Sequence, residues 1–232
     1  MSIWNKIVRR AAGAVRGGSL AAILGQERPD REYPDDRTLD VTFTIAMIAL
    51  SAKMAKSDGF VMADEVEAFH RVCRFPASET ENVRRIFTLA QQDIAGYDVY
   101  ARQIAKTLAD KPEVRRDVLE GLFVIAAADG ILHEKEDEFL RSVAGHLGIG
   151  DAEFCWVRSL FVAEQADPYT VLGIDPSATN AEIKARHRAL SFEHHPDRLT
   201  GRGVPQDFVI IAERKLASIN AAYDAIAKER NI

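Results

Sequence analysis

The sequence predicts an all-α protein with two helical units. Residues 41–52 form an uncharged apolar run, two similar helix-turn-helix segments follow, and the last third carries apolar residues at spacings of three and four. A chain of 232 residues with 47% apolar residues is long enough for two domains, each with its own core. We expect a basic amphipathic leader and charged linker over 1–39, a helical bundle over 40–163, and a small helical domain over 164–232.

Charge is distributed unevenly along the chain. Residues 1–26 carry four basic residues and no acidic one, residues 27–166 have a net charge of −9, and residues 167–232 are balanced. The net charge of −5 leaves no basic excess, so we expect no nucleic-acid partner. Cys73 and Cys155 lie in apolar helical patterns without a CxxC motif, so we expect buried, reduced thiols.

The leader has the pattern of a basic interfacial helix, because its apolar and basic residues recur on different sides of a helix. The candidate membrane contacts are Trp4, Lys6, Arg9 and Arg10. The longest uncharged stretch near it, residues 17–26, is too short to span a bilayer, which takes about 20 residues. The arginines leave too little apolar sequence for a signal peptide, although a transit peptide stays open. Peripheral contact with an anionic membrane and packing on the rest of the protein fit this pattern equally. We therefore expect a cytoplasmic protein, with peripheral attachment to the cytoplasmic face of the inner membrane as the open alternative.

The charged segment 27–40, which contains Pro29 and Pro34, is typical of a linker. The uncharged run 41–52 that follows fits a helix buried in a protein core.

Segments 55–72 and 126–143 are related by a constant offset of 71 positions. The matching pairs are Asp58 and Asp129, Gly59 and Gly130, Val61 and Leu132, Glu65 and Glu136, Glu67 and Glu138, and Val72 and Val143. The repeat predicts a duplicated helix-turn-helix in which each glycine ends a helix in a left-handed conformation. Each following helix begins near Met62 or His133, with the glutamate three positions later in a capping box that is at best half made.

Acidic residues of the repeat suggest a calcium loop as a weak alternative. The candidate ligands are Asp58, Glu65, Asp129 and Glu136. A calcium loop needs oxygen ligands at alternate positions and a glycine at its sixth position, whereas apolar residues 60–62 follow the glycine here. We therefore expect neither a metal nor a cofactor.

This repeated pattern of an apolar helix, a DGxV or DGxL turn and an ExE pair resembles the TerB-like domain of tellurite-resistance proteins. The resemblance covers about residues 40–163. It implies a compact helical bundle with no established catalytic residues.

The last third predicts a short helix followed by two long antiparallel helices. Ser177 or Thr179 caps the first long helix, with Glu182 completing a capping box for Thr179. One face of this helix carries Ile183, His187, Leu190 and His194, while the basic residues Lys184, Arg186 and Arg188 project from the rest. The final helix follows Pro205 and carries Phe208, Ala212, Leu216, Ile219, Tyr223 and Ile226.

Pro196 fixes the conformation of the segment between the two long helices. Because proline disfavours the helical conformation of the preceding residue, the helix ends at His195 and carries the side chains of His195 and Asp197 into a loop. His194 is still on the helix and points elsewhere, so the two histidines are poorly placed as ligands of one metal.

The last third clearly resembles a J-domain, the DnaJ-type co-chaperone module. The resemblance depends on Tyr169, Leu172 and Gly173, the basic helix from Ile183 to Leu190, the tripeptide His195-Pro196-Asp197, and the final INAAYDAI stretch. His187 departs from the family, which usually has a tyrosine there beside the loop. A J-domain that follows a TerB-like bundle resembles the DjlA-like co-chaperones. Their leader is usually a transmembrane helix, whereas arginines interrupt the leader of this chain.

The resemblance implies a function in which the second helix and the tripeptide dock on a DnaK-type chaperone, stimulate its ATPase and couple it to client proteins. The implied contact residues are Lys184, Arg186, Arg188, His195, Pro196, Asp197 and Arg198. The basic residues fit steering toward an acidic surface, and Asp197 fits a charge-assisted bond to a partner cation. ATP hydrolysis belongs to the partner, so we expect that the chain itself is not an enzyme.

Three other functions remain open at this point. In an enzyme, His195 and Asp197 would act as acid and base, but no nucleophile or pocket is evident beside them. In a metal site, His187 and His194 would join Asp197 or an acid of the repeat. In an adaptor or stress-response scaffold, the TerB-like bundle would be the active part and the J-domain would not act on the chaperone.

Overall fold

A computed structural model describes residues 36–57, 69, 80–92, 96–128, 131–162, 166–202 and 204–232 of the chain. Every regular element in these ranges is a helix, which confirms the all-α prediction. The leader, most of the linker and most of the first copy of the repeat lie outside the described residues, as do the candidate contacts Trp4, Lys6, Arg9 and Arg10. Among the described helices, none combines the length and apolar character needed to cross a membrane.

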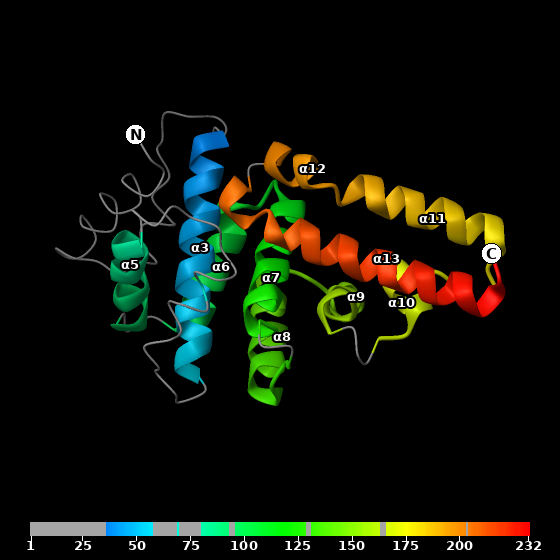
Figure 1. Cartoon of the computed structure of the whole chain (residues 1–232). Helices are drawn as coiled ribbons and strands as arrows, with labels where there is room; N and C mark the ends of the chain where they lie inside the picture. Colours follow the sequence, from blue (N-terminus) through cyan, green and yellow to red (C-terminus); the bar gives the residue numbers. More distant parts are fainter. Residues whose placement is uncertain are drawn as a thin grey trace.

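The first large unit is a bundle arranged around α3 (Asp36–Ser57). Every residue from 43 to 54 is buried, because a helix that is apolar on all sides needs neighbours on all sides. These neighbours are α5 (Thr80–Gln92), α6 (Tyr97–Thr107), α7 (Pro112–Ala126) and α8 (Glu134–Leu147) (Figure 1). The buried helix predicted over 41–52 is thus confirmed. It begins earlier than predicted, since the end of the expected linker forms its first turn.

The start of α8 tests the predicted capping box of the second repeat. The backbone N–H of His133 donates to the Glu136 carboxylate at 2.9 Å, so the Glu136 half of the box is present. Gly148, at a φ of 76°, ends α8 in the left-handed region, and α9 (Asp151–Phe161) follows. The prediction of a buried Cys155 is wrong. This thiol is exposed, because Phe154 and Val157 occupy the inner side of α9 and residue 155 points away from them.

The second unit contains α10 (Pro168–Leu172), α11 (Asn180–Glu193), α12 (Pro196–Gly201), the 3-10 turn η3 (Gln206–Phe208) and α13 (Ile210–Arg230). Helices α11 and α13 lie side by side and extend away from the bundle, with the C-terminus at the far end (Figure 1). Leu172, Ile183, Ile219 and Ile226 belong to a second buried cluster between them and α10, which Leu160 of α9 also joins. The predicted antiparallel pair is therefore confirmed.

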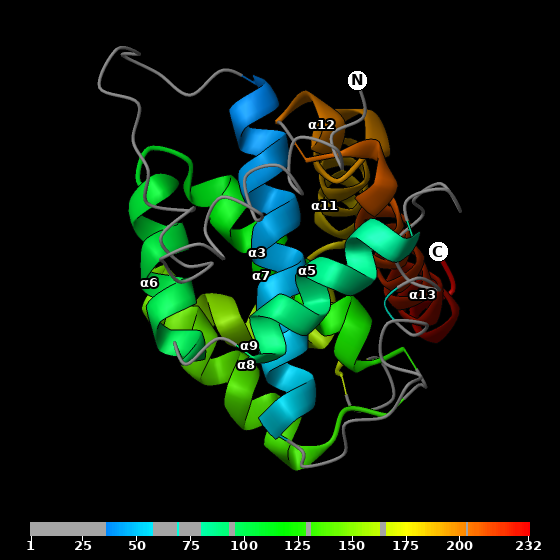
Figure 2. The ribbon, with the colours of Figure 1, turned by 90° about the vertical axis from the view of Figure 1, so that its left-hand side faces the viewer.

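The near end of this second unit packs on the bundle. Figure 2 shows α12 beside the upper part of α3, with α11 and α13 behind it. Five residues of this end belong to the same buried apolar cluster as the bundle: Leu199, Val204, Phe208, Ile211 and Ala212. The Phe208 ring meets the Phe43 ring of α3 edge-on, with the centroids 5.1 Å apart. The bundle core thus extends into the second unit.

Candidate functional site

The N-terminus of α11 is fixed by a complete capping box. The Thr179 backbone N–H donates to the Glu182 carboxylate at 2.7 Å, and the Glu182 backbone N–H donates to the Thr179 hydroxyl at 3.3 Å. The bonds from Thr179 keep the pKa of Glu182 below its usual value. This confirms Thr179 rather than Ser177 as the cap, and it sets the rotation of α11.

The predicted inner face of α11 is also confirmed. Ile183, Leu190 and His194 are buried. The His187 ring stacks on Tyr223 of α13 with the centroids 4.2 Å apart, and its Nε2 lies 2.9 Å from Asn220 Oδ1. A histidine at this position therefore still makes an aromatic stack between the two long helices.

The basic residues of α11 do not behave alike. Lys184 and Arg188 are exposed, as predicted. Arg186 is half-buried, and its Nε donates to the Leu172 carbonyl at the end of α10 at 2.9 Å. The prediction that all three project freely is correct for Lys184 and Arg188 but only partly correct for Arg186. The carbonyl groups at the end of a helix attract such a cation.

His195, Pro196 and Asp197 lie at the start of a helix, which corrects the prediction that they enter an irregular loop. Pro196 is the first residue of α12 and His195 is its N-cap. The Asp197 backbone N–H donates to His195 Nδ1 at 3.3 Å, and the same nitrogen lies 3.6 Å from the Asp197 carboxylate. The side chains of His195 and Asp197 are 56% and 92% exposed. The three residues thus present an ordered and solvent-facing turn.

Phe192 is a surface residue that the sequence analysis missed. Its side chain is 70% exposed, and the Arg198 guanidinium lies 4.5 Å from the ring centroid. The available signal was its position on α11 between the inward residues Leu190 and His194, which places it off the buried face. Phe192 gives the basic surface near the tripeptide an apolar centre.

A hollow of about 310 Å³ lies directly beside the tripeptide. Its lining residues are Pro196, Asp197, Thr200, Val204, Pro205, Gln206 and Val209. The tripeptide therefore borders an open space on the side of Pro196 and Asp197.

Of the four candidate calcium ligands, only Glu136 lies in the part of the chain that the structure describes. Across the described residues, no group of three or more His, Cys, Asp or Glu side chains is arranged to hold a metal ion. Asp58, Glu65 and Asp129 lie outside the described ranges, and Glu136 accepts the His133 N–H. His187 contacts Tyr223, whereas the His194 ring lies 5.9 Å from the Trp156 ring.

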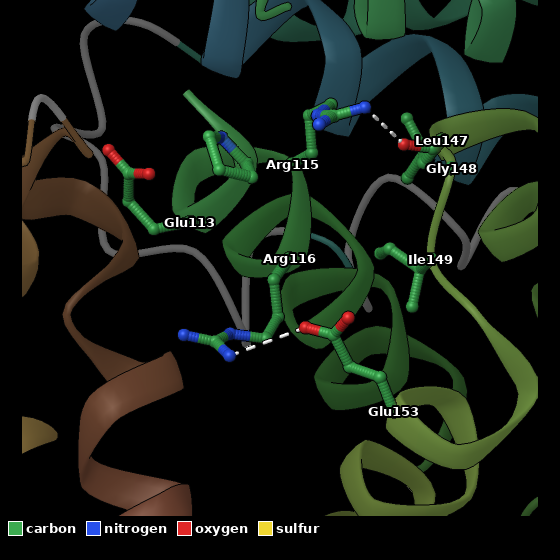
Figure 3. Close-up of a pocket in the computed structure, with 8 residues that line it drawn as sticks. Glu113, Arg115, Arg116, Leu147, Gly148, Ile149 and Glu153 are labelled. Atoms are coloured by element: carbon green, nitrogen blue, oxygen red, sulfur yellow. Dashed lines mark hydrogen bonds and ion pairs between the residues drawn. The ribbon is translucent and has the colours of Figure 1, made fainter. Parts of the chain in front are cut away.

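A second pocket, of about 200 Å³, lies at the N-terminus of α7 (Figure 3). Arg115 donates to the Leu147 carbonyl at 2.8 Å, and Arg116 donates to the Glu153 carboxylate at 3.3 Å. Both arginines therefore tie α7 to the segment from the end of α8 into α9. This pocket fits a structural role in the bundle.

A buried polar cluster between the bundle and α12–α13 was also missed by the sequence analysis. Asp117 Oδ1 accepts from Arg202 Nη2 at 2.7 Å, and Glu120 Oε1 accepts from Lys215 Nζ at 2.7 Å. Burial, followed by the charge of Glu120, raises the pKa of Asp117 to about 7. Burial, followed by Lys215 and nearby arginines, lowers the pKa of His194 to about 3. No local sequence signal marks these pairs, because their members lie 85 and 95 residues apart.

Comparisons with known proteins agree with this architecture. The family model described as tellurite resistance protein TerB matches residues 44–159, and the DnaJ domain model matches residues 167–231. Similar curated proteins are named co-chaperone protein DjlA. The one from Photobacterium profundum is 27% identical over 97% of this chain and 89% of its own length. The one from Coxiella burnetii is 28% identical over 77% of this chain and 74% of its own length.

The DjlA of Escherichia coli strain K12 is 24% identical over 99% of both chains. No solved structure matches the chain. The TerB match covers half of the chain, the DnaJ match follows it, and relatives aligned over almost their whole length share one name. The chain therefore belongs to the DjlA-like J-domain co-chaperones, in which a TerB domain precedes a C-terminal DnaJ domain.

Proposed function

We propose that the chain docks through residues 164–232 on a DnaK-type chaperone, stimulates its ATPase and couples it to client proteins. The observation that carries this proposal is the exposed turn at the start of α12. There, His195 and Asp197 face solvent while Leu199, in the same short helix, is buried. A turn that is ordered by its own cap and anchored from behind suits recognition by another protein.

The docking surface we propose combines charge with a small apolar area. Lys184 and Arg188 of α11 and Arg198 of α12 are exposed, and the Arg198 guanidinium covers the exposed Phe192 ring. Positive charge of this kind accelerates encounter with an acidic partner, while an exposed aromatic ring adds apolar contact area after docking. Half-buried Arg186 contributes to this surface less than the other two basic residues of α11.

The chemistry in this proposal takes place on the partner. His195 Nδ1 accepts the Asp197 N–H and so completes the helix N-terminus. The chain contributes a recognition surface, and the chaperone contributes the bound ATP and the residues that hydrolyse it. The client protein is recognised by the chaperone, by the TerB domain, or by both.

The decisive experiment measures single-turnover ATP hydrolysis by the cognate DnaK-type chaperone, with and without the full chain. The wild-type chain should accelerate hydrolysis, and His195→Gln should abolish the acceleration without changing the fold. His146→Gln is the matched control, because His146 is a half-buried histidine on α8 of the bundle. Equal stimulation by wild type and His195→Gln, or stimulation by neither, would falsify the proposal and favour an adaptor whose J-domain does not act on the chaperone.

The electrostatic part of the proposal has its own test. The double change Lys184→Glu and Arg188→Glu should raise the half-maximal chain concentration about tenfold at low salt, with a smaller effect at high salt. Maximal stimulation should change little, because the tripeptide is intact. Lys106→Glu, on an exposed position of α6, is the control for charge change alone. An effect independent of salt would contradict steering.

We further propose that residues 1–26 attach the chain peripherally to an anionic membrane surface on the cytoplasmic side. The support is the basic amphipathic pattern of Trp4, Lys6, Arg9 and Arg10. Flotation with vesicles containing anionic lipid, using the full chain and a chain without residues 1–26, measures this attachment. Equal flotation of both chains would contradict it.

A further inference from the structure

The contact between the bundle and the near end of the J-domain has an extensive apolar part. Leu199 follows the tripeptide on α12, Phe208 follows it in η3, and both are at most 3% exposed. Phe208 contacts two bundle rings, with centroids 5.1 Å from Phe43 and 6.4 Å from Phe69. The backbone that carries the tripeptide is thus anchored on a surface contributed by the TerB domain.

Two buried hydrogen-bonded pairs complete this contact. Asp117 and Glu120 are one turn apart on α7, and their side chains are fully buried. Asp117 reaches Arg202, which is the C-cap of α12, and Glu120 reaches Lys215 on α13, which is only 2% exposed. One turn of α7 therefore binds both α12 and α13, the two helices on either side of the loop that follows the tripeptide.

Burial makes these pairs sensitive to the loss of one member. A buried ion pair contributes little net stability compared with apolar residues of similar size, but removing one partner leaves an uncompensated buried charge. Among the described residues, Asp117 Oδ2 and Glu120 Oε2 have no hydrogen-bond partner. The geometry is therefore maintained by a small number of direct contacts.

The helix between the anchor and the tripeptide is short. Arg202 caps the C-terminal end of α12, and His195, Pro196 and Asp197 form its N-terminal end. A short helix fixed at one end is the kind of rigid element through which coupling between its two ends is carried.

We propose that Asp117 and Glu120 of the TerB domain are positioning residues for the chaperone-docking tripeptide, acting through Arg202 and Lys215. The inference rests on the proposed function, and it assigns the TerB domain a direct part in that function. The bundle supports α12 from behind, while the tripeptide faces outward. The two carboxylates do not touch the chaperone.

The test compares single and paired variants of the full chain. Glu120→Gln leaves the Lys215 ammonium buried without its counter-ion, and Arg202→Gln weakens the Asp117 contact at a partly exposed position. Each should lower maximal stimulation of the chaperone ATPase about tenfold or more, because small misplacement at a distance has effects of this size. The half-maximal concentration should change much less, since Lys184 and Arg188 are intact.

A paired variant separates positioning from a need for charge. Glu120→Met with Lys215→Met replaces the ion pair by two apolar side chains of similar length, which buried sites accept. This variant should recover most of the stimulation lost in Glu120→Gln. Continued loss in the paired variant, with normal packing of α12, would overturn positioning through this contact.

The control for general destabilisation is Asp137→Asn. It removes a partly buried ion pair of 2.9 Å between Asp137 and Arg158, which connects α8 and α9 within the bundle. Asp137→Asn should stimulate the chaperone ATPase as much as the wild-type chain does. An equal loss in this control, at an equal loss of folding stability, would assign the effect to stability alone.

Hydrogen exchange gives a readout that needs no chaperone. In Glu120→Gln and Arg202→Gln the amides of residues 197–204 should exchange at least tenfold faster than in Asp137→Asn, because the anchor of α12 is weakened. If wild type does not stimulate a chaperone, the proposed function fails while this exchange result still tests the anchor. Unchanged exchange in both variants overturns the inference.

Discussion

The two ends of the α11–α13 pair are stabilised in different ways. At the outer end, near the C-terminus, the contacts belong to the J-domain itself. Arg230 donates to the Tyr169 hydroxyl at 2.8 Å and to the Ala178 carbonyl, and Ile183 and Ile226 are fully buried. At the inner end, the loop and the start of α13 are buried against another domain. The outer end is therefore stabilised mainly by residues of its own domain, with Leu160 of α9 joining its buried cluster, whereas the inner end shares the core of the bundle.

This difference has a functional meaning under the proposed function. The outer end sets the register of α11 against α13, whereas the inner end carries the tripeptide. Rigid support of a recognition turn lowers the conformational cost of binding. The TerB domain supplies that support here, so its contribution is not restricted to recruiting other proteins.

The largest predicted effect comes from Phe208→Ala, which should break the inner end. Removing a fully buried ring should cost about 3–5 kcal/mol of unfolding free energy, measured by urea denaturation. Hydrogen exchange should accelerate in α3 and α7 as well as in α12, since the ring belongs to the shared core. Ile226→Ala at the outer end should cost about 2–5 kcal/mol and accelerate exchange mainly in α10 and α11. Identical exchange patterns would remove the distinction between the ends.

The second prediction concerns pH and the inner end. The pKa of His194 is lowered to about 3 by burial and by Lys215, Arg116, Arg202 and Arg186, so its contribution to stability is complete above pH 6.5 and is lost as pH falls toward 3. Asp117 acts in the opposite direction, because its pKa is raised to about 7 and the folded state retains a proton that the unfolded state releases above pH 4. As pH rises from about 4 to 6.5, His194 therefore increases the free energy of unfolding while Asp117 decreases it.

His194→Phe removes the contribution of His194 to the pH dependence of the unfolding free energy. Relative to wild type, the variant should gain about 2 kcal/mol of unfolding free energy between pH 7 and pH 5, because each pH unit below 6.5 contributes up to about 1.4 kcal/mol. Both ring nitrogens of His194 lack hydrogen-bond partners, so the change deletes no hydrogen bond found among the described residues. Urea denaturation at the two pH values measures the difference. If the variant and the wild type differ by the same unfolding free energy at pH 7 and at pH 5, the assigned contribution of His194 is refuted.

A smaller effect is expected at the outer end from Gly173→Ala. Gly173 ends α10 at a φ of 62°, in the left-handed region, where a side chain costs about 1–2 kcal/mol. Its added Cβ would also lie 3.4 Å from Arg186 Nη2. Gly145→Ala is the control, because in the described part of the chain no atom beyond the neighbouring backbone of α8 lies within 4 Å of the new Cβ, and it should be neutral or stabilising. Equal melting temperatures of the two variants would contradict this prediction.

The smallest effect is expected from Thr179→Ala, which removes half of the capping box of α11. The free energy of unfolding should fall by about 1 kcal/mol, and only the outer end should lose local stability. The amides of the first turn of α11 should lose protection, while those of α12 should not. Faster exchange at α12 would show that the two ends are coupled more tightly than their separate cores indicate.

The sequence was sufficient to predict the parts of the fold that local rules determine. The capping box of Thr179 and Glu182, the end of α11 before Pro196 and the buried run in α3 each depend on residues close in sequence. The helix after the tripeptide was missed, because Pro196 ends one helix and equally begins another as its first residue. The residues of the weak calcium alternative and the leader fall largely outside the described residues, so the predictions of no metal and of a basic amphipathic leader stay predictions.

The inner contact could not be predicted for a physical reason. Periodicity placed Leu216 on the inner face of α13, but Leu216 is half-buried and the neighbouring Lys215 is almost completely buried. A lysine is normally assigned to solvent, whereas this one is paired with the distant Glu120 in the interior. Which lysine is paired in the interior depends on tertiary packing, and one sequence contains no local signal of that packing.

The shared core also has a consequence for the order of folding during synthesis. The bundle helices from α3 to α9 leave the ribosome before Leu199, Phe208 and Ala212, although these residues belong to the same apolar core. Domains commonly fold in turn from the N-terminus as the chain emerges, but here we expect the first domain to close its core only when the second is nearly complete. Protease resistance of ribosome-bound chains should therefore rise when residues 199–212 emerge, and not when α9 emerges.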